Sequence, residues 1–189
     1  MKKQYPTFLK GHLLTAMPAL ADPNFYQTVT CVCEHTPEGA VGIVVNRINS
    51  LISGKDIFDE LNIDYSSDAE SIKIHIGGPV HLNEIFVLHG PPFEWKGTLM
   101  VTSSIALSNT RDILEAIALH KGPECYMIAL GCAGWSPDQL ESEIKRNVWL
   151  TCDASKEIIF ELPIETRWEA AMKKMGIDPA LLSDKTGHA

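Results

Sequence analysis

Two β-forming runs joined by a tight turn constrain the fold of this chain more than any other feature. Residues 28–34 and 40–45 are rich in valine, threonine and cysteine or in small apolar residues, and Thr36-Pro37-Glu38-Gly39 separates them. A connection this short lets the second run return only as an antiparallel neighbour of the first. The sequence therefore predicts a hairpin and excludes a purely parallel sheet.

Other apolar runs alternate with helix signals along the rest of the chain. Helices are expected after Ser53, after Ser108 or Asn109, after Ser136-Pro137, and at residues 165–175, because each has a capping residue or apolar residues at helical spacing. Strands are expected at residues 9–16, 72–76, 85–88, 98–102, 126–130 and 158–160. Strands interleaved with helices, together with one hairpin, predict the α/β class, with a mixed sheet covered by helices.

Composition predicts a single globular domain over residues 1–189. Hydrophobic residues make up 45% of the chain and charged residues 21%, which is ordinary globular usage. A chain of 189 residues is long enough to bury one substantial core. We expect an ordered core at about residues 8–176 and disorder only at the two ends.

The net charge indicates which binding partners are disfavoured, and the cysteine content indicates the cellular compartment. The formal net charge of −8 does not favour direct nucleic-acid binding, which rests on many lysine and arginine contacts to phosphate. We expect neither export nor membrane spanning, because Thr7, Lys10 and His12 precede any apolar stretch of signal-peptide length and no later run approaches about 18 apolar residues. Five cysteines without a scaffold spacing suit free thiols in a reducing compartment, so a cytoplasmic protein is expected.

Cys31, Cys33 and His35 suggest a metal site at first sight. On a regular strand they would share one face with Val29, because side chains alternate with a period of two. A structural zinc site needs four ligands, however, and no second pair accompanies these three. We expect no metal and no cofactor, and interpret the two cysteines as small buried core residues.

Candidate chemistry is incomplete elsewhere in the chain. His89 ends an apolar run and is the best-placed general base, with Ser103 or Ser104 as its nucleophile in a hydrolase hypothesis, although no nucleophile-elbow motif frames either serine. Cys132 precedes an expected helix start, which can lower a thiol pKa. Gly77-Gly78 is interpreted as a tight turn, with anion binding by its amides as the alternative.

One set of motifs resembles a known family. Residues 131–141, read as Gly-Cys-Ala-Gly-Trp-Ser-Pro-Asp-Gln-Leu-Glu, are similar to the YqgE/AlgH family of bacterial proteins. Agreement continues through residues 11–18, 22–25, 39–47, 77–80, 86–89 and 147–150 in the family's order. The family usually has tyrosine at the position of Cys132, which argues against a shared functional thiol there.

The resemblance implies a sandwich-like α/β fold, with a smaller α+β lobe as a variant, and the label of transcriptional regulator. It implies no mechanism. Our leading hypothesis is a non-enzymatic binding or regulatory module acting through a protein or small-molecule partner, and the hydrolase is the alternative. The expected ligand cleft is formed by residues at the ends of elements, which are Asn46, Arg47, Gly77, Gly78, His89, Ser103, Gly134, Trp135 and Gln139.

Overall fold

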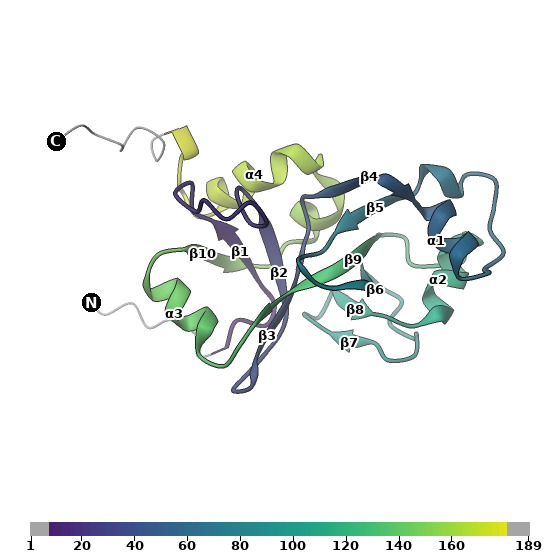
Figure 1. The fold of residues 1–189 in the computed structure, drawn as a ribbon, viewed down its shortest axis with the longest axis horizontal. Helices are drawn as coiled ribbons and strands as arrows, with labels where there is room; N and C mark the ends of the chain where they lie inside the picture. The colour runs from purple at the N-terminus through teal and green to yellow at the C-terminus, as the bar shows by residue number, and fades with distance from the viewer. Residues whose placement is uncertain (1–7, 181–189) are drawn as a thin grey trace.

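One curled sheet organises the chain in the computed structural model, which describes residues 8–180 (Figure 1). The strand order is β10-β1-β2-β3-β9-β6-β8-β7, and the β4–β5 pair joins through β9. The strands are β1 (His12–Ala16), β2 (Val29–Thr36), β3 (Gly39–Val44), β4 (Ile48–Ser53), β5 (Lys73–Ile76), β6 (Val80–His89), β7 (Leu99–Met100), β8 (Ala106–Ser108), β9 (Tyr126–Trp135) and β10 (Trp149–Asp153).

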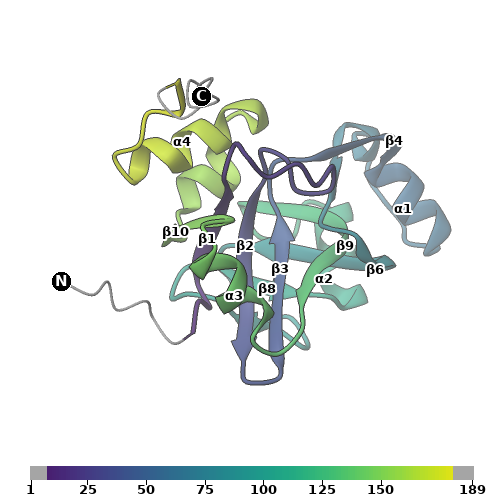
Figure 2. The ribbon, with the colours of Figure 1, turned by 60° about the vertical axis from the view of Figure 1, so that its left-hand side comes forward.

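Helices are short and pack on the sheet from different sides (Figure 2). They are α1 (Gly54–Glu60), α2 (Arg111–Ala118), α3 (Gln139–Lys145) and α4 (Arg167–Lys174), with shorter turns η1 (Ala69–Ser71), η2 (Glu157–Glu161) and η3 (Ile164–Thr166). No helix within residues 8–180 is both long enough and apolar enough to cross a membrane. Residues 1–7 and 181–189, where disorder was expected, lie outside the described residues.

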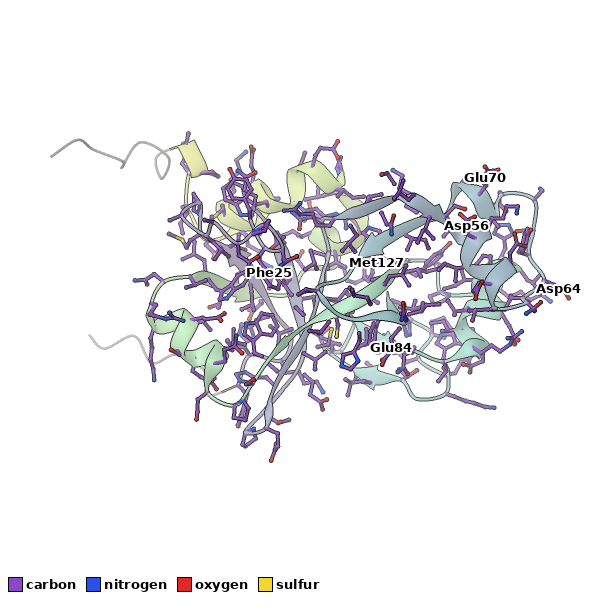
Figure 3. The ribbon with its side chains drawn as sticks, in the orientation of Figure 1. Phe25, Asp56, Asp64, Glu70, Glu84 and Met127 are labelled. Carbon is purple, nitrogen blue, oxygen red and sulfur yellow. The ribbon has the colours of Figure 1, made fainter. Side chains whose placement is uncertain are left out.

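Three apolar cores hold the helices to the sheet. The central core lies inside the curl and includes Leu13, Ile43 and Leu88 beneath Trp168 and Met172 of α4. A second core packs α1 and α2 on β5, β6 and β9 through residues that include Phe58, Ile74, Ile113, Ile117 and Ile128. A third core packs α3 on the outer face of β1–β3 and includes Leu14, Val32, Leu140, Trp135 and Trp149. Met127 lies near the middle of the molecule and Phe25 beside β1–β3, whereas Asp56, Asp64 and Glu70 gather at the α1 end (Figure 3).

Strand β9 connects the two halves of the sheet. Its first half pairs in parallel with β5 and antiparallel with β6, and its second half pairs antiparallel with β3. The two halves meet at Gly131, whose φ of 72° is a left-handed conformation that favours glycine. Strand β9 is therefore shared by the two halves of the curled sheet, and Gly131 lies at the point where its pairing partners change.

The backbone around Gly131 leaves no room for side chains. A Cβ atom at Gly131 would lie 2.6 Å from the carbonyl oxygen of Gly78, and one at Gly77 would lie 2.2 Å from the carbonyl oxygen of Gly131. Gly78 has a φ of 150°, so the predicted positive φ is confirmed, although residues 77 and 78 form an extended connection between β5 and β6 and not a tight turn. Close approach of two backbones is the second reason for glycine here, and the sequence analysis did not anticipate it.

Several predicted elements are confirmed in place. The hairpin forms between β2 and β3, with Thr36 opposite Gly39. Ser53 caps α1 in a capping box, because its hydroxyl accepts from the backbone N–H of Asp56 and the Asp56 carboxylate accepts from the backbone N–H of Ser53. The predicted mixed sheet with helices is right in outline, but the chain is mostly β and forms one curled sheet, where the family resemblance implied a sandwich.

The strand predicted at residues 158–160 is wrong. These residues lie in the single π-helical turn η2, where the backbone N–H of Leu162 bonds to the carbonyl of Glu157 at 2.9 Å. Ile158 and Ile159 are buried in the central core beside α4. A short apolar run has no periodicity that separates a strand from a helical turn, and tertiary packing decided between them.

Other boundaries differ from the prediction. The strand expected at residues 98–102 is reduced to the two-residue β7, and α3 begins at Gln139 because Asp138 has a φ of 61°. Strands β4, β8 and β10 were not predicted. Their runs are short or contain serine, asparagine and aspartate, so their pairing depends on neighbours that lie far away in the chain.

The prediction that His35 shares a face with Cys31 and Cys33 is wrong. The register between β2 and β3 shifts between Val32 and Glu34, and this bulge turns the following side chains over. Cys31 and Cys33 lie in the central core, whereas the His35 ring accepts from the backbone N–H of Leu9 and donates to Glu141 of α3. The three side chains therefore do not converge.

Substituting Gly131→Ala should lower the free energy of unfolding by about 2 kcal/mol or more, because the new Cβ meets a backbone oxygen and the residue must keep a positive φ. Gly134→Ala is the matched control in the same strand, since its Cβ would make an ordinary 3.4 Å contact with Val80. We expect the control to change stability by less than about 0.5 kcal/mol. Urea unfolding of both variants measures the difference, and equal losses would contradict the crowding argument.

Candidate functional site

Five of the nine predicted ligand-binding residues line two neighbouring cavities, and four, Asn46, Gly77, His89 and Ser103, line neither. Arg47 and Gly78 line the first, which has a volume of about 400 Å³ and is called the Arg47 cavity here. Gly134, Trp135 and Gln139 line the second, of about 280 Å³, called the tryptophan cavity. The remaining lining of the Arg47 cavity is Pro23, Asn24, Val44, Ile76, Pro79 and Leu82, and that of the tryptophan cavity is Leu20, Asp22, Phe25, Glu143, Arg146, Val148 and Trp149.

One loop separates the two cavities. Of four consecutive residues between β1 and β2, Pro23 and Asn24 line the Arg47 cavity, while Asp22 and Phe25 line the tryptophan cavity. The loop turns on itself, because the carbonyl of Asp22 accepts from the backbone N–H groups of Phe25 and Tyr26. A shift of this loop would alter both cavities together.

Asn46 holds the end of that loop. Its side-chain oxygen accepts from the backbone N–H of Val29 at 2.8 Å, and its amide nitrogen donates to the carbonyl of Gln27 at 2.8 Å. Arg47 adds a bond of 2.6 Å from its guanidinium to the carbonyl of Tyr26. Asn46 is thus a positioning residue, whereas Arg47 both holds the loop and lines a cavity.

A bulge in β6 forms the opposite wall of the Arg47 cavity. Val80 pairs with Cys132 and Ile85 with Leu130, so five residue steps of β6 (85 − 80) span two steps of β9 (132 − 130). The extra residues project from the sheet, and the side chain of Leu82 is 61% exposed. Sequence reasoning missed Leu82 because nothing in its local pattern marks an exposed leucine at a bulge.

Glu143 organises the tryptophan cavity. One of its carboxylate oxygens accepts from the indole N–H of Trp135 at 2.9 Å and of Trp149 at 2.8 Å, and the other accepts from the Gln139 amide at 2.9 Å. Phe25 stacks edge-on against Trp149 with ring centroids 5.5 Å apart. Because Glu143 already accepts from three donors, these hydrogen bonds hold the aromatic rings in place and pair the two indole N–H groups and the Gln139 amide within the protein. Glu143 was not among the predicted residues, although its position four after Gln139 was a usable signal.

His89 lies apart from both cavities and is fully buried. Its Nδ1 lies 2.7 Å from the carbonyl oxygen of Gly90, which can only accept, so Nδ1 carries the proton. Its Nε2 then accepts from the hydroxyl of Ser108 at 2.9 Å. Burial lowers the pKa of His89, so the ring is neutral at pH 7.

The predicted pairing of His89 with Ser103 or Ser104 does not form. Ser103 is exposed, and the Ser104 hydroxyl lies 3.5 Å from that of Thr102. Ser108 is itself only 1% exposed and also contacts the Thr98 hydroxyl at 2.9 Å. A serine and histidine so enclosed tie β6 to β8 and offer no access for a substrate, so the geometry gives the hydrolase hypothesis no support.

Comparison with known proteins identifies the group to which this fold is related. The family model described as AlgH-like matches residues 13–180. A UPF0301 protein of Desulforapulum autotrophicum is 51% identical and the match covers 96% of each chain; one of Nitrosospira multiformis is 48% identical, covering 96% of this chain and 97% of the other.

Solved structures agree with these matches. The solution structure of the AlgH protein from Pseudomonas aeruginosa superposes with a TM-score of 0.81 at 42% identity, covering 100% of both chains. The crystal structure of a Corynebacterium diphtheriae protein shares the fold alone, with a TM-score of 0.75 at 17% identity over 97% of this chain and 94% of the other. None of these descriptions states a reaction or a ligand.

Replacing Ser108 by alanine should lower the free energy of unfolding by about 1–3 kcal/mol, because the buried Nε2 of His89 loses its donor. Ser103→Ala is the control, since Ser103 is exposed, and we expect a change within about 0.5 kcal/mol. Chemical denaturation compares the two variants. Labelling of Ser103 or Ser104 in the folded wild-type protein by a serine-reactive probe would contradict this structural interpretation and favour a hydrolase.

Proposed function

This chain belongs to the AlgH-like family, and from that premise we propose that it is a non-catalytic binding module that holds a segment of a partner protein in the Arg47 cavity. The observation that carries the proposal is the apolar rim of this cavity. Ile76 is 43% exposed, Val80 39% and Leu82 61%. Three large apolar side chains exposed together mark an interaction surface, whereas scattered ones need no explanation.

The rim is continuous around the β5–β6 loop. Ile76 ends β5, Val80 begins β6, and Leu82 stands on the β6 bulge. A Cβ at Gly134, which lines the tryptophan cavity, would lie 3.4 Å from the Val80 side chain, so Val80 lies close to that cavity. An extended segment that covers Leu82 and Val80 would therefore run from one cavity toward the other.

A protein segment fits this cavity better than a small molecule does. Small-ligand pockets typically enclose about 70–90% of the ligand surface. Here the rim side chains stand in solvent, and burying them requires a partner that extends over the edge of the cavity. Each such apolar side chain contributes roughly 1.5–3 kcal/mol when fully buried.

Arg47 specifies the polar part of the partner segment. It is the charged residue among those that line this cavity, and only one bond of its guanidinium, to the carbonyl of Tyr26, is used within the described residues. A guanidinium offers five N–H donors and pairs well with a carboxylate. We infer that the segment presents an apolar side chain to Leu82 and Ile76 and an acidic group to Arg47.

A regulatory role through protein contact is consistent with the charge of the chain. The net charge of −8 opposes direct binding to DNA, so an effect on transcription would pass through the bound protein. We propose that the module acts in the cytoplasm, where the five cysteines, all free in the structure, would stay reduced.

Binding should depend on Leu82 and not on Leu51, a still more exposed leucine elsewhere. We would recover partners of the full-length protein from its own host, identify them by mass spectrometry, and measure the affinity of a purified partner by calorimetry. Leu82→Asp should weaken binding on the order of ten-fold or more, because it places a charge in the apolar contact. Arg47→Gln should weaken it less and reduce its salt dependence.

Leu51→Asp supplies the matched control for this measurement. Leu51 is 90% exposed in β4 and does not line the cavity, so the same substitution there should leave the affinity unchanged. Equal melting temperatures of the variants would show that folding is intact. A partner bound equally by wild type and Leu82→Asp would overturn the proposal, and a tightly retained small molecule in the same cavity would replace it with a small-ligand function.

A further inference from the structure

A third cavity lies where β5 and β9 meet the segment that leads into α4. Its volume is about 390 Å³, and its polar lining includes Lys73, His75, Glu161, Glu165 and Arg167. It shares no lining residue with the Arg47 cavity or the tryptophan cavity. Its interpretation is therefore independent of the proposed protein-binding function.

His75 lines this cavity and carries an unsatisfied acceptor beneath the cavity surface. The side chain is buried, at 6% exposure, and its Nδ1 lies 3.3 Å from the carbonyl oxygen of Ile128. A carbonyl oxygen can only accept, so Nδ1 carries the proton and Nε2 carries a lone pair. Nε2 is buried and has no hydrogen-bond partner among residues 8–180. An unpartnered buried polar atom is uncommon in folded proteins, and a bound water or ligand often accounts for it. Three other buried atoms within residues 8–180 are in the same state, namely Thr15 Oγ1, Thr30 Oγ1 and Trp95 Nε1, but none of these residues lines this cavity.

The neutral state of His75 makes this acceptor permanent at physiological pH. Burial, reinforced by the positive charges of Arg167 and Lys73, lowers the pKa of His75 to about 4. At pH 7 the ring is therefore uncharged, and Nε2 accepts a hydrogen bond.

Arg167 brings a buried positive charge to the same cavity. Its side chain donates to the carbonyls of Leu162 at 3.0 Å and Val45 at 2.6 Å, which uses two of its five N–H donors. The residue is 5% exposed, and no salt bridge within the described chain involves it. Glu165 interacts with Arg167 electrostatically without forming a salt bridge. A buried cation without a close anionic partner is costly, and a bound anion would compensate it.

The other charged groups of the cavity are exposed. Lys73 lies on the same face of β5 as His75, two residues away, and adds a second positive charge. Glu161 and Glu165 also line the cavity, and both are exposed. Solvent screens the exposed carboxylates more than the buried guanidinium, so the interior of the cavity favours an anion.

We propose that this cavity binds a small oxyanion that also carries a hydroxyl group, with the anionic oxygens facing Arg167 and Lys73 and the hydroxyl donating to Nε2 of His75. The anionic group and the hydroxyl group of the ligand interact with two different residues of the site. The charge compensates Arg167, and the O–H satisfies His75. Both the protonated forms of phosphate, or of a phosphate monoester, and a hydroxycarboxylate have this chemistry.

Nuclear magnetic resonance titration of the full-length protein at pH 7 tests the site directly. Inorganic phosphate, glycolate and acetate would each be added at constant ionic strength while amide chemical shifts are followed. Phosphate or glycolate should give saturating shifts at residues 73–75, 127–128 and 161–167. Acetate should bind on the order of five-fold more weakly than glycolate, because the acetate ion has no O–H to donate to His75.

Two variants separate the roles of the cavity residues. His75→Leu should abolish the preference for glycolate over acetate, which a merely structural role of His75 would leave unchanged. Lys73→Gln should weaken every anion by a few-fold, and Lys121→Gln, the same charge change outside the cavity, should have no effect. Arg167 is not substituted, because it also holds Leu162 and Val45.

Each outcome of the titration decides the proposal. Saturation by phosphate alone supports a phosphate-type ligand, and saturation by glycolate alone supports a hydroxycarboxylate. Equal binding of glycolate and acetate would overturn the assigned role of His75. Two results would overturn the site. One is a set of chemical-shift changes spread over surface lysines, and the other is a lack of saturation by either hydroxyl-bearing anion at 50 mM, roughly the upper end of weak specific binding. Water would then be the partner of Nε2.

Discussion

The close approach of two backbone segments at Gly131 is the constraint on which the rest of this structure depends. Gly77 and Gly78 pass so near β9 that neither they nor Gly131 can carry a side chain. That crossing lets β9 pair with β5 and β6 in its first half and with β3 in its second. The curl of the sheet, the central core inside it and the start of β6 beside the Arg47 cavity all follow from this contact.

The three cavities lie where elements meet and not within any one element. The β1–β2 loop separates the Arg47 and tryptophan cavities, and the segment before α4 closes the third against β5 and β9. The cavities differ chemically because the polar groups of the tryptophan cavity are hydrogen-bonded within the protein, whereas some polar groups of the third cavity are not. Glu143 accepts from three donors, whereas within residues 8–180 Nε2 of His75 has no hydrogen-bond partner and Arg167 forms no salt bridge. The unsatisfied groups indicate a ligand, and the satisfied cluster indicates a structural role.

Local signals in the sequence were sufficient where a residue acts on its immediate neighbours. The Ser53–Asp56 capping box and the β2–β3 hairpin formed as predicted. Local signals were insufficient where contacts with distant residues decide the secondary structure. In η2, for example, the apolar residues join the central core from a helical turn and not from a strand. The predicted ligand-binding residues are separated in the structure for the same reason. Gly134, Trp135 and Gln139 line the tryptophan cavity, whereas His89 and Ser103 line neither that cavity nor the Arg47 cavity.

By itself, the sequence determined the hairpin, the capped start of α1, the apolar face of α2 and the positive φ at Gly78, because chain stereochemistry and short-range hydrogen bonds decide these features. Motif resemblance added the family. Only the tertiary structure decided that His35 turns away from Cys31, that Leu82 is exposed on a bulge, and that His75 and Arg167 line the same cavity. These depend on strand register and on contacts between segments up to 122 residues apart, which no local pattern encodes.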